Sequence, residues 1–221
     1  MKEFASGVFR LPRFRFLIWA LASISFACLL GEFYGVWKMK LFACFVVLPA
    51  MIALAVIAVV WKRSPDESRR ELSTLIIEGA LGGLFAAVIY DLYRLPFVMN
   101  GYPLFKVFPE FGKMLLGHDE PNWLVQLLGW SYHFSNGAAL GIMLTMMVGN
   151  ASKKVLFWSA TAWALTVEII LLMTPYRDFF KIAIPFQTFL ILTGTAHLIF
   201  GVALGWWCVR RLGRIRVVAA G

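Results

Sequence analysis

Five ionisable side chains lie within long, otherwise apolar stretches of this sequence. They are Glu78, Asp91, His133, Glu168 and His197. A charged group inside a membrane costs about 2.5–3.5 kcal/mol on insertion scales, so such residues usually mark a function or a paired partner. Histidine titrates near neutrality, and burial pushes a glutamate toward the same range. We therefore interpret these residues as candidates for a proton relay, a cation path or a binding site.

The two apolar-segment histidines begin the same local pattern, His-x3-Gly-x2-Leu-Gly, at His133 and again at His197. In a helix, residues at i, i+4 and i+8 share one stripe, so each His lies in line with two glycines. Small residues at this spacing let helix backbones approach closely. The glycines expected at such helix contacts are Gly79, Gly83, Gly137, Gly141, Gly201 and Gly205. Each His is therefore expected to face protein rather than lipid.

We expect His133 and His197 to point into the protein at a shared polar centre with Glu168, the acid nearest to their depth. The same three residues are candidate ligands of a transition metal, and the two imidazoles are candidate axial ligands of haem. A structural role stays open, in which polar side chains only hold neighbouring helices together. Asp91 is expected to form an i,i+3 ion pair with Arg94.

The composition identifies the environment of these residues. The chain has 221 residues, of which 61% are hydrophobic and 15% are charged. Soluble domains are about 45–50% apolar and about 25% charged. A cytosolic enzyme, a secreted domain and a disordered chain are therefore excluded, and the long uncharged runs exclude an outer-membrane barrel. The fold class expected is an all-α integral membrane protein.

Hydropathy predicts a bundle of six transmembrane helices within a single membrane domain, 1–221. The predicted spans are 16–34, 41–61, 72–93, 123–148, 155–174 and 184–208. They form three hairpins, 16–61, 72–148 and 155–208, between basic tails at 1–15 and 209–221. The first span is expected to be retained rather than cleaved as a signal peptide. Cys28, Cys44 and Cys208 show no CxxC spacing, so no disulfide framework is expected.

Positive charge predicts the orientation of the chain. Of its 21 Lys and Arg residues, 14 lie in the two tails and in the loops after spans two and four. The positive-inside rule then places both termini in the cytoplasm of a bacterial inner membrane. The net charge of +9 is spread over span ends rather than gathered in one patch. The expected partner is thus the lipid bilayer and no nucleic acid, with a homo-oligomer or a membrane-complex partner left open.

Spans three to six have the features of a parallel repeat of two helical hairpins, spans 3–4 and 5–6. Each first helix carries an acid, Glu78 or Glu168, and each second helix carries the His-Gly pattern. Between spans three and four lies a long outer loop, 94–122. Its apolar content predicts a short interfacial or re-entrant segment that caps the outer mouth of the bundle. His118 in this loop is expected to be solvated.

No catalytic motif is present: the sequence lacks a GxSxG elbow, an HExxH helix, a P-loop and a CxxCH haem-attachment site. Neither an enzymatic activity nor a cofactor is therefore required by the sequence. The function favoured is translocation of a small ion or solute, coupled to protonation of the buried His/Glu cluster. The alternatives are a membrane redox, metal- or haem-binding protein that uses His133 and His197, and a non-catalytic subunit of a membrane complex.

Overall fold

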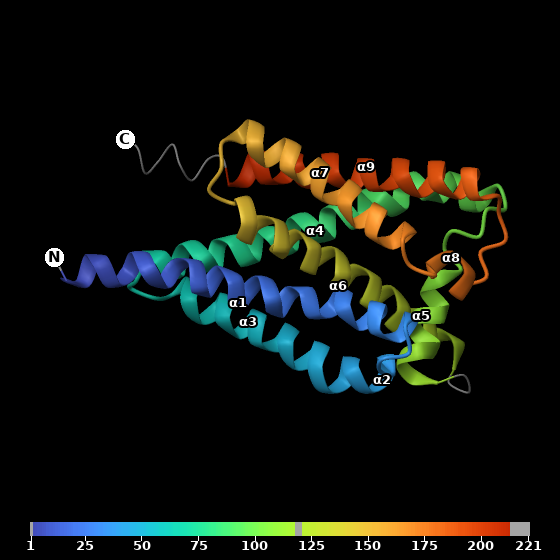
Figure 1. The fold of residues 1–221 in the computed structure, drawn as a ribbon, viewed down its shortest axis with the longest axis horizontal. Helices are drawn as coiled ribbons and strands as arrows, with labels where there is room; N and C mark the ends of the chain where they lie inside the picture. Colours follow the sequence, from blue (N-terminus) through green and yellow to red (C-terminus); the bar gives the residue numbers. More distant parts are fainter. Residues whose placement is uncertain (1, 118–120, 213–221) are drawn as a thin grey trace.

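A computed structural model describes residues 2–117 and 121–212, and side chains from Arg13 onward. These residues form helices and no strand. The long helices are α1 (Lys2–Phe33), α3 (Leu48–Lys62), α4 (Glu67–Met99), α6 (Asn122–Val148), α7 (Lys153–Leu172) and α9 (Phe186–Arg211). The short ones are α2 (Met39–Phe42), the π-helix η1 (Ala43–Val47), α5 (Val107–Leu116) and α8 (Tyr176–Phe179). The long helices run along one common direction, and α5 and α8 lie together at one end (Figure 1).

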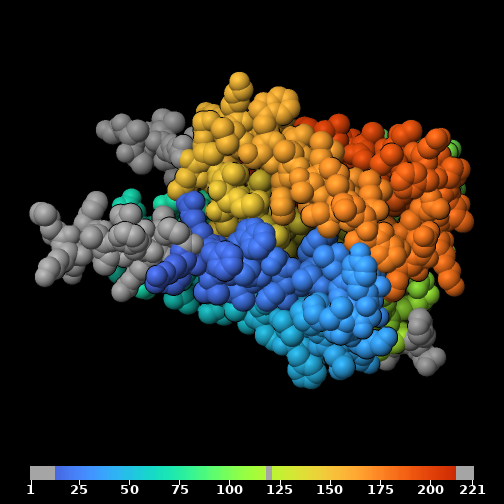
Figure 2. Space-filling view, viewed as in Figure 1, coloured from blue at the N-terminus to red at the C-terminus, as the bar shows by residue number. Residues whose placement is uncertain are grey.

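Five helical segments of the described residues are long and apolar enough to cross a membrane. They are Arg13–Phe33, Met39–Lys62, Glu67–Met99, Lys153–Leu172 and Phe186–Arg211. The helix α6 has 27 residues but is not among the five, because it carries polar side chains such as His133, Ser135 and Asn136. It packs against α1, α4, α5 and α7. This helix is therefore largely enclosed by other helices, and α1 and α7 cover much of it in the space-filling view (Figure 2).

The outer surface of the bundle is apolar, as insertion into a membrane requires. Large hydrophobic side chains are exposed along α3 and along α7 and α9, among them Ile52, Val56, Trp158, Ile169 and Ile191. A soluble monomer rarely exposes contiguous apolar surface of this extent. In hydrocarbon the same side chains lose nothing by exposure, whereas each backbone N–H and C=O must be satisfied within its helix. These helices are therefore compatible with a multi-pass membrane protein.

Local sequence signals account for several helix boundaries. Asp66 accepts a hydrogen bond from the Ser68 backbone N–H at 2.9 Å and caps the start of α4. Ser152 caps α7 by accepting a hydrogen bond from the Val155 backbone N–H. Both residues satisfy N–H groups that the first turn of a helix leaves without a partner. The two caps are the last residues of the turns at 63–66 and 149–152. Both turns lie at the end of the bundle where α1 begins and α9 ends (Figure 1).

The outer loop begins later than its sequence suggests. We expected the span to end near Tyr93, but α4 continues through Arg94 and Pro96 to Met99. Proline removes one backbone N–H and disfavours a helical conformation in the residue before it. Here the surrounding packing outweighs that local preference. As a result Arg94 lies on a helix rather than in a loop, and its side chain is buried.

The expected capping segment is the helix α5. Its residues Val107, Phe108 and Phe111 are buried against the bundle. A Cβ added at Gly112 would collide with the Val125 backbone of α6, so the two helices touch without intervening side chains. The segment is thus packed into the protein and is not a passive anchor on the membrane surface. His118 lies outside the described residues.

Close backbone contacts join the helices in pairs. A Cβ added at Gly79 of α4 would lie 2.8 Å from the Gly141 carbonyl oxygen of α6, and one added at Gly83 would strike the Gly137 carbonyl. In the second pair, a Cβ added at Gly201 of α9 would lie 2.7 Å from Cα of Thr161 in α7. Only glycine fits at these separations, because any Cβ would overlap backbone atoms that cannot rotate away.

We predict that Gly83→Ala lowers the stability of the protein by about 1–3 kcal/mol, because the added methyl group overpacks the α4–α6 contact. Gly194→Ala is the matched control in α9, since nothing described lies within 4 Å of a Cβ at that position. Alanine there should be neutral or stabilising by up to about 1 kcal/mol. Thermal unfolding of the detergent-purified variants would measure both effects. Equal behaviour of the two variants would contradict the close contact.

Candidate functional site

A layer of buried polar side chains separates two apolar clusters inside the bundle. On α1, Ser25 lies between Ala22 of one cluster and Cys28 of the other. On α6 and α9, the histidines lie in the corresponding interval between the two clusters. The layer contains the described ionisable residues Asp91, Arg94, His133, Glu168 and His197. Groups of this kind need partners in a low-dielectric interior, and their geometry shows how each obtains one.

His133 forms a close pair with Asp91. Its Nε2 lies 2.8 Å from Oδ2 of Asp91, whose residue is 8% exposed. A ring nitrogen that faces a carboxylate carries the hydrogen, so Nδ1 is the acceptor of the neutral ring. The other carboxylate oxygen, Oδ1, accepts a longer hydrogen bond of 3.4 Å from Nη1 of Arg94. The ring of Phe108 covers the imidazole, with ring centroids 4.6 Å apart.

His197 forms a second pair, with Glu168. Its Nδ1 lies 2.8 Å from Oε2 of Glu168 and 2.9 Å from the Thr193 carbonyl oxygen. The Nδ1 hydrogen is donated to the Thr193 carbonyl oxygen, and among the described residues Oε2 of Glu168 has no hydrogen-bond partner. Nε2 of the ring is left for other partners. The Thr193 hydroxyl donates to the second carboxylate oxygen at 2.5 Å. Glu168 is only 3% exposed. This hydrogen bond joins α9 to α7 and orients the carboxylate.

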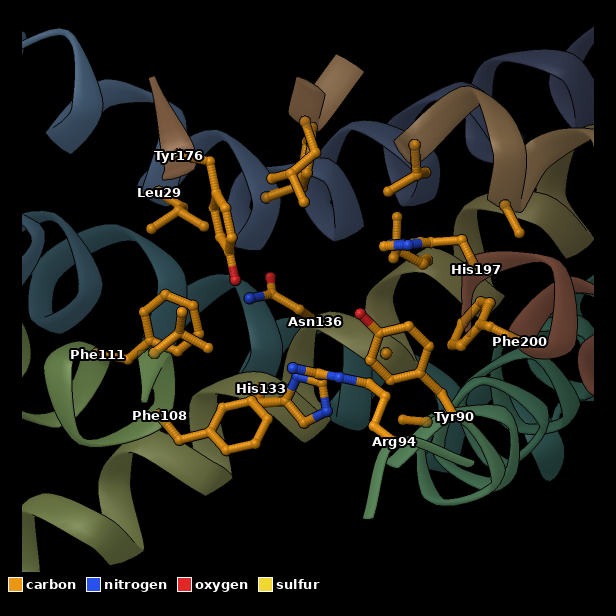
Figure 3. Close-up of a pocket in the computed structure, with 18 residues that line it drawn as sticks. Leu29, Tyr90, Arg94, Phe108, Phe111, His133, Asn136, Tyr176, His197 and Phe200 are labelled. Carbon is orange, nitrogen blue, oxygen red and sulfur yellow. The ribbon is translucent and has the colours of Figure 1, made fainter. Parts of the chain in front are cut away.

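Both imidazoles line one cavity of about 110 Å³. Tyr90 lies between them, with its ring centroid 6.2 Å from that of His133 and 5.1 Å from that of His197. The polar ends of Tyr90, Asn136, Tyr176 and both imidazoles gather around the same space in Figure 3. Its aromatic lining includes Phe26, Phe108, Phe111 and Phe200. A space of this size accommodates several water molecules or one small molecule.

Arg94 is the most unusual residue of the cavity lining. It is 4% exposed, and its guanidinium lies 4.7 Å from the Tyr90 ring centroid and 5.1 Å from that of Phe105. Its Nη2 donates to the Leu104 carbonyl oxygen. Among the described residues its Nε has no hydrogen-bond partner. A buried guanidinium N–H without an acceptor is costly, so this atom is suited to bind an acceptor from a ligand.

The structure gives each histidine its own acid. The acid beside His133 is Asp91, which also forms the expected ion pair with Arg94, and Glu168 contacts His197 but not His133. Glu78 is not part of the cavity. Both of its carboxylate oxygens accept hydrogen bonds of 3.0 Å from Arg211 of α9. Both histidines face the same space, as expected, and each has its own carboxylate neighbour there.

Three polar residues that line the cavity were not among the candidates from the sequence, namely Tyr90, Asn136 and Tyr176. Asn136 follows His133 by three positions in the same apolar segment, and an uncharged polar residue at that spacing was an available signal. Its Oδ1 accepts a hydrogen bond of 2.7 Å from Ser25, so its amide hydrogens remain as donors. Burial raises the pKa of Tyr176, which keeps this phenol protonated and able to donate.

The candidate metal ligands do not converge. Among the described residues no group of three or more His, Cys, Asp or Glu side chains is placed to hold a metal ion. His133 and Asp91 form one pair, and His197 and Glu168 form another. The ring of Tyr90 lies close to both imidazoles. A haem bound between them would have to displace this side chain, so these residues do not fit a bis-histidine haem site.

Comparisons with known proteins leave the geometry as the only guide to function: no protein-family model, no curated protein and no solved structure matches the chain.

We predict that the two His–carboxylate pairs are energetically coupled within each pair. Double-mutant cycles that combine His133→Ala with Asp91→Ala, and His197→Ala with Glu168→Ala, should give coupling energies of about 0.5–3 kcal/mol in thermal or denaturant unfolding. The crossed cycle of His133→Ala with Glu168→Ala is the control and should give a smaller value. A larger coupling in the crossed cycle would contradict the pairing described above.

Proposed function

We propose that this chain is a six-span membrane protein that moves a small solute or ion across the bilayer together with protons. The observation that carries the proposal is that the imidazoles of two separate His–carboxylate pairs line one cavity in the middle of the bundle. A carboxylate behind each imidazole stabilises the ring when it takes up a proton. The cavity can thus change its charge in steps while a solute occupies it.

The helix register supports an internal repeat of two hairpins, α4 with α6 and α7 with α9. Ala87 lies four residues before Asp91, and its Cβ is 2.9 Å from a Cβ added at Gly137, four residues after His133. Ala164 lies four residues before Glu168, and its Cβ is likewise 2.9 Å from a Cβ added at Gly201, four residues after His197.

Each hairpin thus carries an acid and an alanine on its first helix and a histidine and a glycine on its second. In this register Asp91 and Glu168 occupy equivalent positions in the two hairpins, and Glu78 lies outside the repeat. Two hairpins of the same orientation are related by an axis along the membrane normal, as in transporters built from parallel repeats.

The proposal needs a route on each side of the cavity. On one side α5 covers it with Val107, Phe108 and Phe111. On the other, the glycine contacts of α4 with α6 leave no space between the backbones. Further along α4 and α9, Arg211 joins these helices through its paired hydrogen bonds to Glu78. Solute movement would require these contacts to open in turn, which is the essential property of alternating access.

Orientation in the membrane is part of the proposal. We place both termini in the cytoplasm of a bacterial inner membrane, with α5 and α8 on the outer side. The cation distribution supports this orientation, as does the antiparallel course of six long helical segments (Figure 1). The chain is then a single membrane domain of three hairpins.

We predict that reporters fused after Gly221 and inserted in the outer loop near Gly101 report opposite sides of the membrane. An alkaline phosphatase and a green fluorescent protein would serve as the complementary pair, because each is active on one side only. The fusion after Gly221 should give fluorescence and no phosphatase activity. If both positions reported the same side, the six-span topology would be refuted.

We predict that proteoliposomes containing this protein acidify or alkalinise in response to a solute gradient, measured with a trapped pH-sensitive dye. Formate, acetate, methylammonium and glycerol would be the solutes tested. His133→Ala and His197→Ala should each reduce the protein-dependent proton movement at least tenfold without loss of membrane insertion. Gln187→Ala is the control, because this polar residue is exposed and lies outside the cavity.

Absence of protein-dependent proton movement with every solute would refute proton coupling. Loss of activity in the Gln187→Ala control, or in proportion to folded protein in the His variants, would assign the histidines a structural role instead.

A further inference from the structure

We infer that the ligand of the cavity is a small carboxylate monoanion and that Arg94 is its anchor. The inference rests on the proposed function and deepens it by naming the class of solute. Its starting point is the unpartnered Nε of Arg94, a buried cation that lines the cavity. A guanidinium has five donors and no acceptor, and planar carboxylates match its geometry.

The other polar groups around the cavity are mainly donors. Asn136 has its carbonyl oxygen occupied by the Ser25 hydroxyl, so it offers its amide hydrogens. Tyr176 is a protonated phenol that lines the same space. His197 donates its Nδ1 hydrogen to the Thr193 carbonyl oxygen, so Nε2 becomes a second donor when the ring is protonated. With the imidazoles protonated, a ligand with two acceptor oxygens satisfies such a set.

The carboxylates of the site lie beside the imidazoles and do not line the cavity. Asp91 lies against His133, and Glu168 lies against His197 and Thr193. Neither acid is among the residues that line the space. An anion in the cavity therefore meets the guanidinium and the imidazoles first, and the two negative groups lie behind them.

The charge of the site favours an anion only after protons are bound. The charged and titratable groups that face the cavity or contact its histidines are Tyr90, Asp91, Arg94, His133, Glu168, Tyr176 and His197. The described residues that α1 and α5 contribute to the lining are all apolar. With both imidazoles neutral, Arg94 and the two carboxylates leave a net charge of −1.

With both imidazoles protonated, the net charge becomes +1, which one monoanion neutralises. Binding of the anion is thus linked to the uptake of protons. Because the anion is bound together with protons, its affinity falls as the pH rises. Anion and protons would then move in the same direction.

The test uses the purified full-length protein in lipid nanodiscs, with sodium formate and sodium acetate as probes. The rise in thermal midpoint with probe concentration gives an apparent Kd, and sodium chloride at equal ionic strength is the baseline. Acetamide and methylammonium chloride are the neutral and cationic counterparts of similar size. We expect the carboxylates to stabilise the protein above the chloride baseline, with an affinity at least tenfold higher at pH 6 than at pH 8.

Arg94→Gln should reduce carboxylate affinity at least tenfold. Because Arg94 also donates to the Leu104 carbonyl oxygen, this variant loses a buried structural contact as well, so Tyr176→Phe provides a second test. That variant removes one donor and keeps the ring, so the affinity should fall severalfold. Arg177→Gln is the matched control, since Arg177 lies at the same end of the bundle, pairs with Asp178 and does not line the cavity.

Carboxylates that act no better than chloride or acetamide, or stronger binding of methylammonium, would overturn the inference. An affinity that is unchanged in folded Arg94→Gln and in Tyr176→Phe would overturn it as well. Carboxylate binding without proton movement in proteoliposomes would support the inference and refute the proposed transport. Proton movement driven by methylammonium alone would support proton coupling and refute the choice of anion.

Discussion

The whole arrangement depends on the need to neutralise charge inside an apolar bundle. Two carboxylates and one guanidinium lie almost fully buried between two apolar clusters. An isolated buried charge costs several kcal/mol even after relaxation, so each must have a partner close by. His133 and His197 provide partners for Asp91 and Glu168, and the guanidinium of Arg94 is supported by Asp91, a carbonyl oxygen and aromatic rings.

Close packing of small residues makes these pairs possible. The glycine contacts bring α4 against α6, and α9 against α7, with almost no side chain between the backbones. At that separation a carboxylate on one helix reaches an imidazole on the next without extending into lipid. Because each histidine lies one turn from a contact glycine, the position of the pair follows directly from the register of the helices.

The site combines fixed and adjustable charge. The guanidinium of Arg94 is always charged, whereas an imidazole gains its charge by binding a proton. A carboxylate lies beside each imidazole and would pair with the ring once it is protonated. Aromatic side chains and the covering helix α5 line much of the cavity, and a low-dielectric surrounding strengthens electrostatic contacts.

Much of the architecture was predictable, because hydrophobic length and small-residue spacing are local properties of the chain. The apolar runs indicated the long helices, and the i, i+4, i+8 stripes indicated that His133 and His197 face protein. The sequence could not show that His133 pairs with Asp91 rather than Glu168, because the choice depends on which helices become neighbours. Nor could it show that α4 continues through Pro96, since tertiary packing there overrides a local preference. The cavity itself, with Tyr90 between two histidines that are 64 positions apart in the chain, exists only after α4, α6 and α9 have packed together.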